Sequence, residues 1–458
     1  MSMPIHNGSF WFDSLDAPVT ATPAAPLPAK VDVAIIGAGF TGLWTAYYLL
    51  LQDPGLDIAI FDANVAGFGA SGRNGGWCMG WAMGIEQLLA RPKLAERGLV
   101  TARAMQNTVD EIGRVSQAEN IDCHYAKGGT LTVATTPFHA ARMQETVKHR
   151  HALGFTQDDY AWLQPDDARQ RLAMTPNYGA LYTPHCAAIH PARLVRGLSA
   201  MLRSRGVAIH ELTPVLSYEK GRLQTGRGSV NADVILRATE GYTDSIAGHK
   251  RQLLPLYSMM VATEPLSDET WSQIGLARRE TFGDARRVVI YGQRTLDNRI
   301  AFGGRAGYYF GSRRIPVVPP EDRHFAKVEQ TLKQLFPILE STRITHRWGG
   351  LMGVPRHWRP FVTFDRRSGL GAAGGYTGEG VAATNLAARI LADLVMDRDT
   401  ANTHLPWVED VPRRWEPEPF RWLGVSAIER FGDRADAAEL DSGRPSKLWG
   451  WLFDRFVG

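Results

Sequence analysis

The chain has 458 residues, 44% of them hydrophobic and 21% charged, which is the composition of an ordinary globular protein with two or three folding units. The net charge of +4 is small for this length, and no basic cluster with interleaved aromatic residues occurs, so nucleic acid is not expected as a partner. Cys78, Cys123 and Cys186 lie far apart, without metal-ligand or disulfide spacing, which predicts no metal site and a reducing, cytoplasmic location.

Residues 1–30 are expected to form an extended lead-in. Four prolines between positions 18 and 28 disfavour helix, whereas Ser9-Phe-Trp-Phe12 is aromatic and is predicted to pack on the body. The segment lacks a basic region followed by an apolar one, so no signal peptide is predicted. No run of 18 apolar residues occurs in the chain, so no membrane-spanning helix is expected.

The stretch from Val31 to Asp62 has the order strand, tight turn, helix, strand and acid. Its parts are the apolar run Val33–Ile36, the turn Gly37-Ala-Gly39-Phe-Thr-Gly42, the helical run Leu43–Leu51 and the apolar run Ile58–Phe61 before Asp62. This order is typical of a dinucleotide-binding unit, and a glycine-rich turn in some other α/β unit would not explain the acid.

Each of the three glycines in that turn has a physical reason. Gly37 allows the tight turn, Gly39 lets the backbone approach a pyrophosphate, and Gly42 lets the helix pack closely on the strand. Asp62 lies twenty residues beyond Gly42, where a carboxylate accepts hydrogen bonds from ribose hydroxyls.

Two further glycine-rich turns occur along the chain. Gly67–Gly76 holds five glycines with Ser71, Arg73 and Asn74 between them, and it is either a ligand-binding loop with backbone donors and a cation or a flexible surface loop. Gly374–Gly380 follows a short predicted strand and opens a final helix, so its N–H groups are expected to face an anionic or electron-rich ligand.

The intervening sequence predicts further helices and a second, mostly antiparallel sheet. Helices are expected over 85–120, 137–153, 165–174, 192–205, 321–336 and 381–396, and strands over 125–135, 181–189, 207–210, 214–218, 221–225, 229–236 and 370–375. The second sheet is expected to contain 251–265, 288–291, 299–304 and 345–352.

Seven stretches in this order resemble the D-amino-acid-oxidase-type flavoproteins, a family that includes glycine and sarcosine oxidases, and within it the gamma-glutamylputrescine-oxidase-like enzymes. They are Ser9–Asp13, Asp32–Ala46, Gly69–Gly76, His190–Leu194, Ala238–Thr243, Arg347–Gly350 and Gly375–Val381. The resemblance implies an α/β fold with a Rossmann-like FAD-binding domain (31–90, 190–250 and 345–400) and a second, mostly antiparallel substrate domain (91–189 and 251–344).

The resemblance also implies non-covalently bound FAD and assigns its contacts. The glycines of the first turn would hold the pyrophosphate, Asp62 the ribose, Val215 the adenine, and the last turn the N1/O2 edge of the flavin. The full expected set is Gly37, Gly39, Phe40, Thr41, Gly42, Asp62, Ala63, Ser71, Gly72, Arg73, Asn74, Gly75, Gly76, Val215, Thr239, Gly350, Thr377, Gly378, Glu379, Gly380 and Val381.

Three residues depart from the family's pattern. Glu240 stands where asparagine is common, Arg237 interrupts an apolar strand, and Glu379 stands where histidine or a neutral residue is common. None of the three removes a glycine, so the expected change concerns substrate recognition rather than cofactor binding.

The implied reaction removes hydride from the carbon next to an amine nitrogen, gives an imine that water hydrolyses, and ends with O2 forming H2O2. Tyr257, Arg305, Trp348 and Tyr376 are the candidate catalytic residues, with Arg305 able to bind a substrate carboxylate. Two alternatives stay open, namely a dehydrogenase that passes electrons to quinone and a flavin-binding subunit without turnover. An NAD-dependent dehydrogenase would leave the second and third glycine turns unexplained.

Residues 401–458 form a tail rich in arginine and tryptophan. Its last part, Lys447–Val457, is apolar with cations at its flanks, a composition that suits either a helix docked on the body or a dimer partner, or an interfacial helix on the cytoplasmic side of a membrane.

Overall fold

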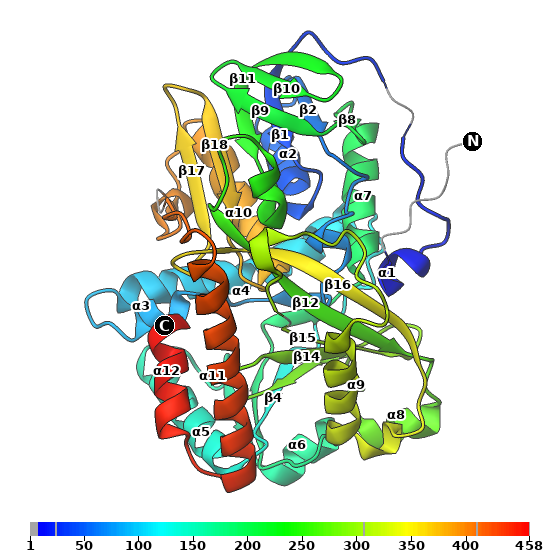
Figure 1. Cartoon of the computed structure of the whole chain (residues 1–458), viewed down its shortest axis with the longest axis vertical. Coiled ribbons are helices and arrows are strands. Elements are labelled where there is room, and N and C mark those ends of the chain that lie inside the picture. The colour runs from blue at the N-terminus through cyan, green and yellow to red at the C-terminus, as the bar shows by residue number, and fades with distance from the viewer. Residues whose placement is uncertain (1–7, 23–24, 306, 409–410, 458) are drawn as a thin grey trace.

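The computed structural model describes residues 8–22, 25–305, 307–408 and 411–457 and shows two lobes, each built on one large sheet (Figure 1). The first sheet has the order β17-β18-β11-β1-β2-β8, with β9 and β10 attached through β11. Its strands are β1 (Lys30–Ile36), β2 (Ile58–Phe61), β8 (Ala208–His210), β9 (Val215–Glu219), β10 (Arg222–Thr225), β11 (Gly228–Arg237), β17 (Phe361–Asp365) and β18 (Leu370–Gly374).

The centre of this sheet is parallel, as the predicted dinucleotide unit requires. Strand β1 pairs in parallel with β2 on one side and β11 on the other, so Val33 lies between Ile58 and Val234. Helices α2 (Phe40–Gln52), α7 (Pro191–Ser204) and α10 (Gly380–Val395) belong to the same lobe (Figure 1). The expected Rossmann-like architecture is confirmed.

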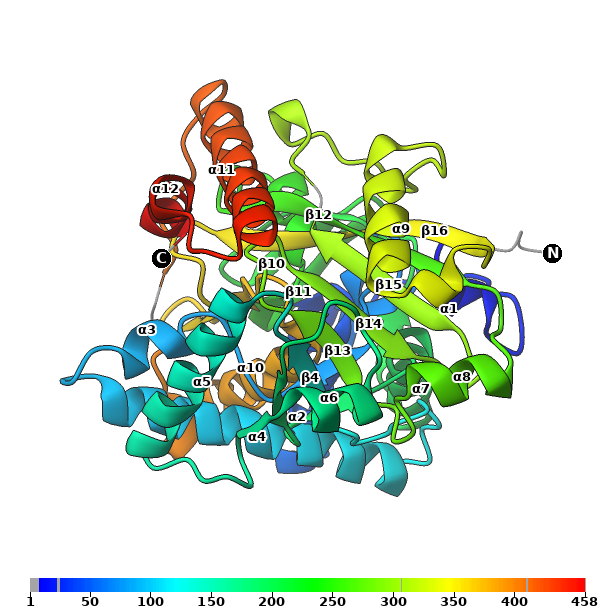
Figure 2. The ribbon, with the colours of Figure 1, turned by 90° about the horizontal axis from the view of Figure 1, so that it is seen from below.

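The second sheet has the order β16-β12-β15-β14-β13-β4-β6-β5 and is antiparallel except for the pair β13–β4. Its strands are β4 (Thr130–Val133), β5 (Ala161–Leu163), β6 (Ala180–Thr183), β12 (Leu253–Thr263), β13 (Thr281–Asp284), β14 (Ile290–Arg294), β15 (Ile300–Arg305) and β16 (Ile344–Pro355). Helices α5 (Pro137–Ala152), α6 (Pro165–Arg171), α8 (Asp268–Ile274) and α9 (Arg323–Leu335) lie around it (Figure 2).

Several predicted elements are shorter or divided in the structure. The helix expected over 85–120 is two helices, α3 (Ile85–Leu89) and α4 (Ala95–Ala118), because Pro92 falls between them and cannot continue a helix. The strand expected over 181–189 is also two: β6 belongs to the second sheet, while β7 (Cys186–Ala188) pairs with β3 (Trp77–Met79).

The N-terminal segment packs on the body, as expected, but it is not extended throughout. Phe10–Asp13 forms the short helix α1, whose N-cap Ser9 accepts a hydrogen bond from the Phe12 N–H. Phe10, Trp11 and Phe12 are buried against Trp348 of β16 and neighbouring residues. The aromatic content of Ser9–Phe12 therefore reflects packing between the N-terminus and the second sheet.

The C-terminal tail forms two helices, α11 (Phe420–Ser442) and α12 (Lys447–Val457), which lie against the second lobe and close to each other (Figures 1 and 2). None of the helices in the described ranges combines the length and the apolar content that a membrane span needs. The tail is thus a docked part of the fold, although α12 leaves some apolar side chains exposed.

Candidate active site

All three glycine turns contribute to one cavity of about 470 Å³ between the two lobes. Of the residues predicted as cofactor-binding or catalytic, those that line it are Gly37, Gly39, Phe40, Thr41, Asp62, Ala63, Ser71, Arg73, Asn74, Gly75, Val215, Thr239, Gly350, Tyr376, Gly378, Glu379, Gly380 and Val381. Gly42, Gly72, Gly76, Thr377, Tyr257 and Trp348 are outside the lining, and the Arg305 side chain lies outside the described residues.

The first turn is shaped by close backbone contacts. Gly37 has a φ of +110°, and a Cβ there would lie 2.5 Å from the Ala238 carbonyl oxygen of β11. A Cβ on Gly42 would lie 2.0 Å from the Gly37 carbonyl oxygen, so Gly42 serves helix packing rather than the lining. Helix α2 begins after Gly39, and Gly39, Phe40 and Thr41 line the cavity, so the positive N-terminus of the helix faces it.

Asp62 stands at the end of β2, at the edge of the cavity. Its carboxylate accepts hydrogen bonds from the Ala38 N–H and the Asn64 N–H, both at 2.7 Å. Burial nevertheless raises the pKa of the Asp62 carboxyl to about 6, with a smaller contribution from the negative charge of Glu211. The carboxyl is thus fixed in orientation, and its pKa lies above the ordinary range of an aspartate.

The second turn places a buried cation beside the cavity. Arg73 is 1% exposed, and its Nη1 donates to the Pro316 and Gly349 carbonyl oxygens at 2.6 and 3.4 Å. Its Nε and Nη2 have no hydrogen-bond partner in the described chain, and its guanidinium lies 4.5 Å from the centre of the Phe68 ring. A buried guanidinium with two nitrogens that have no hydrogen-bond partner among the described residues is suited to an anionic ligand.

The third turn opens α10, whose first residues line the cavity. Glu240 begins the 3₁₀ turn that follows β11, and its side chain contacts the third glycine turn. Its Oε1 accepts hydrogen bonds from the Gly375 and Tyr376 N–H groups, each at 3.1 Å. Burial raises the pKa of the Glu240 carboxyl to about 7, and these two N–H groups oppose that rise. The departure at Glu240 is therefore a support for the turn as well as a part of the cavity wall.

The other two departures have different positions. Arg237 lies outside the lining and is satisfied by neutral acceptors, since it donates to the Tyr218 and Thr243 hydroxyls and to Gln252 Oε1 at 3.2, 2.8 and 3.1 Å. Glu379 is the N-cap residue of α10 and lines the cavity. Of the three departures, Glu240 and Glu379 can therefore contact a ligand directly.

Residues that the sequence did not single out form the wall contributed by the second sheet. Tyr291 of β14 packs against Gly75, and its hydroxyl lies 2.5 Å from Ser258 Oγ of β12. Ser258 Oγ also donates to the Gly304 carbonyl oxygen at 3.1 Å. Further lining residues from this side are Val289, Arg314, Leu351 and Met352. No motif surrounds these residues in the sequence: Leu351 and Met352 lie on β16, whereas Val289 and Arg314 lie in the loops that precede β14 and follow β15.

The predicted catalytic residues outside the lining have structural contacts. Tyr257 is 1% exposed, its hydroxyl accepts a hydrogen bond from the Ile315 N–H at 2.6 Å, and it lies 3.2 Å from the Ile315 carbonyl oxygen. Trp348 is also 1% exposed, and its Nε1 donates to the Arg73 carbonyl oxygen at 2.8 Å. Both side chains fix segments that carry cavity residues, whereas Tyr376 lines the cavity and shares a 2.9 Å hydrogen bond with Thr41.

The donors and acceptors of the cavity fit a flavin dinucleotide. Two helix N-termini and the unused Arg73 N–H groups suit phosphate and flavin oxygens, and Asp62 suits a ribose. None of the described lining residues is a cysteine or a histidine.

Comparison with known proteins agrees with this geometry. Residues 32–394 match the model of the family described as "FAD dependent oxidoreductase" (DAO). The chain is 29% identical to the probable oxidoreductase OrdL of Rhizobium meliloti, over 87% of this chain and 90% of that protein. It is 28% identical to the gamma-glutamylputrescine oxidoreductase of Escherichia coli, over 91% and 93% respectively.

Among solved structures, the chain resembles the glycine oxidase of Geobacillus kaustophilus, with a TM-score of 0.70, 18% identity, and coverage of 85% of this chain and all of that one. This likeness extends to the parallel sheet and the largely antiparallel second sheet. The chain therefore belongs to the D-amino-acid-oxidase-type family of FAD-dependent oxidoreductases.

Proposed function

We propose that this protein binds one FAD non-covalently in the cavity and uses it to remove hydride from the carbon next to the nitrogen of a small-molecule amine. The product imine would be hydrolysed to an aldehyde or keto acid plus an amine, and O2 would reoxidise the cofactor with release of H2O2. The first sheet would hold the cofactor, and the second sheet would form the substrate side. FAD, when bound, supplies the hydride acceptor.

The observation that carries the proposal is the meeting of three glycine turns, about 340 positions apart in the sequence, on one cavity. Beside it lies buried Arg73, whose Nε and Nη2 have no hydrogen-bond partner among the described residues. The relative named gamma-glutamylputrescine oxidoreductase and the solved glycine oxidase support the choice of an amine as substrate. The absence of cysteine and histidine from the described lining supports non-covalent binding.

The chain's own residues would orient the amine rather than deprotonate carbon. Ser258 Oγ is able to donate to the Gly304 carbonyl, and in that arrangement the Tyr291 hydroxyl donates to Ser258. The Tyr291 oxygen would then accept an N–H of the substrate amine and hold its nitrogen in place. The apolar side chains of Leu351 and Met352 would exclude water from the reacting carbon and favour the neutral amine.

The function is tested by anaerobic titration of the purified holoprotein with a panel of primary, secondary and amino-acid amines. We expect at least one amine to bleach the visible flavin band, and we expect peroxide to form in a one-to-one ratio with amine when air is admitted. Bleaching without peroxide would favour a quinone or carrier as acceptor. A bound flavin that no amine bleaches would contradict the proposed reaction.

Asp62 gives the proposal a pH signature. Because burial raises the pKa of its carboxyl to about 6, the folded apoprotein protonates Asp62 as the pH falls through that value. A protonated carboxyl accepts ribose hydroxyls poorly, so we expect FAD affinity to fall below pH 6, by up to about tenfold per pH unit. Asp62→Asn should bind FAD more weakly and without this dependence. Fluorescence titration of the apoprotein with FAD between about pH 5 and about pH 8 measures the affinity and its pH dependence. The same pH dependence in both proteins would contradict the role of Asp62 as a ribose acceptor.

A second arrangement, with a membrane quinone as electron acceptor, is favoured by one observation. Helix α12 leaves Leu448, Trp451 and Phe456 exposed by 60%, 61% and 52%, and the charged residues exposed among them are Lys447, Asp454 and Arg455. An apolar helix side with flanking cations is able to lie in the interface of an anionic bilayer.

This arrangement is best tested by point variants, since a truncation would also uncover the second lobe. If it holds, full-length protein should sediment with phosphatidylglycerol vesicles but not with phosphatidylcholine vesicles, and Trp451→Ser with Phe456→Ser should abolish sedimentation. Equal sedimentation of the double variant and the unchanged protein would remove the membrane role from α12.

A further inference from the structure

The C-terminal helices contact the two loops through which the second lobe reaches the cavity. The first wall loop, residues 285–289, joins β13 to β14 and ends on Val289, which lines the cavity. The second wall loop, residues 307–316, follows β15 and carries Arg314, which also lines it. We call residues 415–457 the C-terminal strap.

The strap binds the backbone N–H groups of the first wall loop. Asp436 of α11 is 6% exposed, and its two carboxylate oxygens accept hydrogen bonds from the Arg287 and Val288 N–H groups, each at 2.8 Å. These are the two residues directly before Val289. One carboxylate that binds two consecutive N–H groups fixes the direction in which the chain enters the cavity wall.

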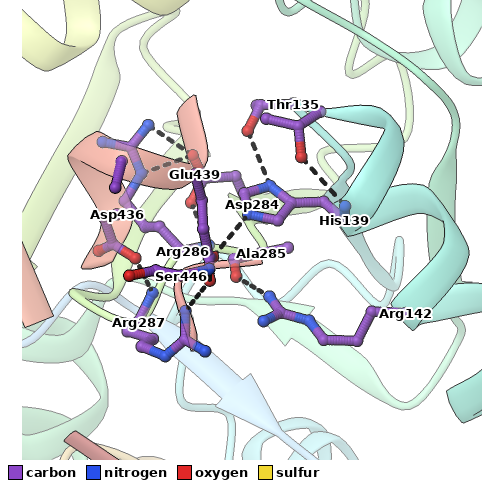
Figure 3. Close-up of polar contacts among 12 residues, drawn as sticks. Thr135, His139, Arg142, Asp284, Ala285, Arg286, Arg287, Asp436, Glu439 and Ser446 are labelled. Carbon is purple, nitrogen blue, oxygen red and sulfur yellow. Dashed lines mark hydrogen bonds and ion pairs between the residues drawn. The ribbon is translucent and has the colours of Figure 1, made fainter. Parts of the chain in front are cut away.

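The neighbouring polar contacts leave this loop little freedom (Figure 3). Glu439, which is fully buried, accepts from Arg287 Nη1 at 2.7 Å and lies 3.5 Å from His139 Nε2 of α5. Arg142 of α5 donates to the Ala285 carbonyl oxygen, and Asp284 pairs with Arg286 at 2.6 Å. The first wall loop is therefore enclosed between α5 and the strap, and each of residues 285–288 contacts a charged side chain.

The strap holds the second wall loop through Glu418. Its Oε1 accepts hydrogen bonds from the Tyr308 hydroxyl at 2.5 Å and from the Gly311 N–H at 3.2 Å. Arg421 of α11 pairs with the same carboxylate at 3.0 Å. Farther along this loop, the Pro316 carbonyl is the 2.6 Å acceptor of Arg73. The position of the loop is thus coupled both to the strap and to the buried guanidinium.

Building on the proposed function, we propose that the C-terminal strap forms the back of the substrate wall, with Asp436 and Glu418 as positioning residues that set which amine fits. The matched region of the family ends at residue 394, so the strap lies beyond it. The carboxylates do not reach the cavity themselves; they act through Val289 and Arg314. The strap keeps the two wall loops in place, and the position of these loops determines which substrate fits the cavity.

The experiment compares Asp436→Ala, Asp436→Asn and Glu418→Gln in the full-length holoprotein with the control Asp433→Asn. Asp433 is a carboxylate on the same helix, but its side chain is 49% exposed and pairs with Lys327 of α9 instead of a wall loop. Asp436→Ala should raise KM for the best amine about tenfold, with the limiting rate of flavin reduction within about twofold. The KM of Asp436→Asn should lie between those of Asp436→Ala and the unchanged protein, because the amide oxygen keeps one acceptor. Glu418→Gln should also raise KM. Asp433→Asn should match the unchanged protein.

A second measurement does not depend on amine oxidation. Iodide quenching of flavin fluorescence reports how open the wall is, and Asp436→Ala should increase the quenching constant while Asp433→Asn leaves it unchanged. If no amine reduces the flavin of the unchanged protein, the proposed reaction fails, yet quenching still tests the strap. Equal quenching and equal KM in Asp436→Ala and Asp433→Asn, with both proteins folded, would overturn the inference.

Discussion

Replacement of Arg73 by methionine is expected to give a folded protein that is purified without flavin. Methionine keeps an apolar stem of similar reach but removes the only buried guanidinium of the described lining, whose Nε and Nη2 have no partner among the described residues. Hydrogen bonds to charged groups contribute about 1.5–3 kcal/mol each, so the loss of FAD affinity should be at least about 100-fold. Titration of the apoprotein with FAD measures the change directly.

The conservative variant and a control sharpen this prediction. Arg73→Lys keeps the charge but loses the planar guanidinium, so its FAD affinity should lie between those of the unchanged protein and Arg73→Met. Arg103→Met removes an arginine that pairs with Asp159 at 2.6 Å, outside the cavity lining, and should leave FAD affinity unchanged. Full flavin occupancy in Arg73→Met would show that the anionic ligand of this cavity is held elsewhere.

Gly42→Ala is expected to destabilise the first lobe by about 3 kcal/mol or more and to abolish flavin binding. The added Cβ would lie 2.0 Å from the Gly37 carbonyl oxygen, which is backbone and belongs to the same turn. Relief of this contact requires α2 to move away from β1, and that movement opens the turn to which the pyrophosphate would bind. Thermal unfolding and flavin content, measured on the same preparation, record both effects.

The same substitution at another helical glycine provides the control. Gly424 lies in α11, and a Cβ there would meet no heavy atom within 4 Å. Gly424→Ala should therefore stabilise the helix by about 0.5–1 kcal/mol, the helix propensity difference alone, and leave flavin content unchanged. Similar losses in the two variants would mean that a general sensitivity of the fold, rather than the Gly37–Gly42 contact, explains the effect.

The first lobe was largely predictable because its signals are local. The strand Ile58–Phe61 has the predicted bounds, and the glycine turn and Asp62 follow a sequence order that leaves few conformations open. The meeting of the three turns followed from the resemblance, since no local pattern fixes the order β18-β11-β1-β2. Glycine turns can be predicted from the sequence because each glycine is needed for its own backbone geometry.

The part of the cavity wall that comes from the second lobe was not predictable in the same way. Tyr257 and Trp348 were singled out as aromatic residues of the second sheet, but their polar atoms bond the backbone of neighbouring segments. Ser258, the residue after Tyr257, points to the opposite side of the same strand and lines the cavity, because side chains alternate along a strand. A shift of one residue thus separates a cavity residue from a buried support, and sequence alone does not show which face is which.

The tail illustrates a further limit. The apolar composition of Lys447–Val457 predicts a helix there, but no helix is predicted over α11. The docking of α11 depends on Asp436 and Glu439, whose partners Arg287 and Val288 are about 150 positions earlier. Charged residues in a helix ordinarily indicate its solvated side. The sequence therefore could not show that these two carboxylates are buried against a cavity loop.

The absorbance spectrum of the purified full-length protein, recorded before and after protein denaturation and ultrafiltration, tests most directly whether this cavity holds one exchangeable flavin. We expect a yellow protein with one FAD per chain, all of it released into the filtrate. A colourless protein that takes up no added FAD would contradict it.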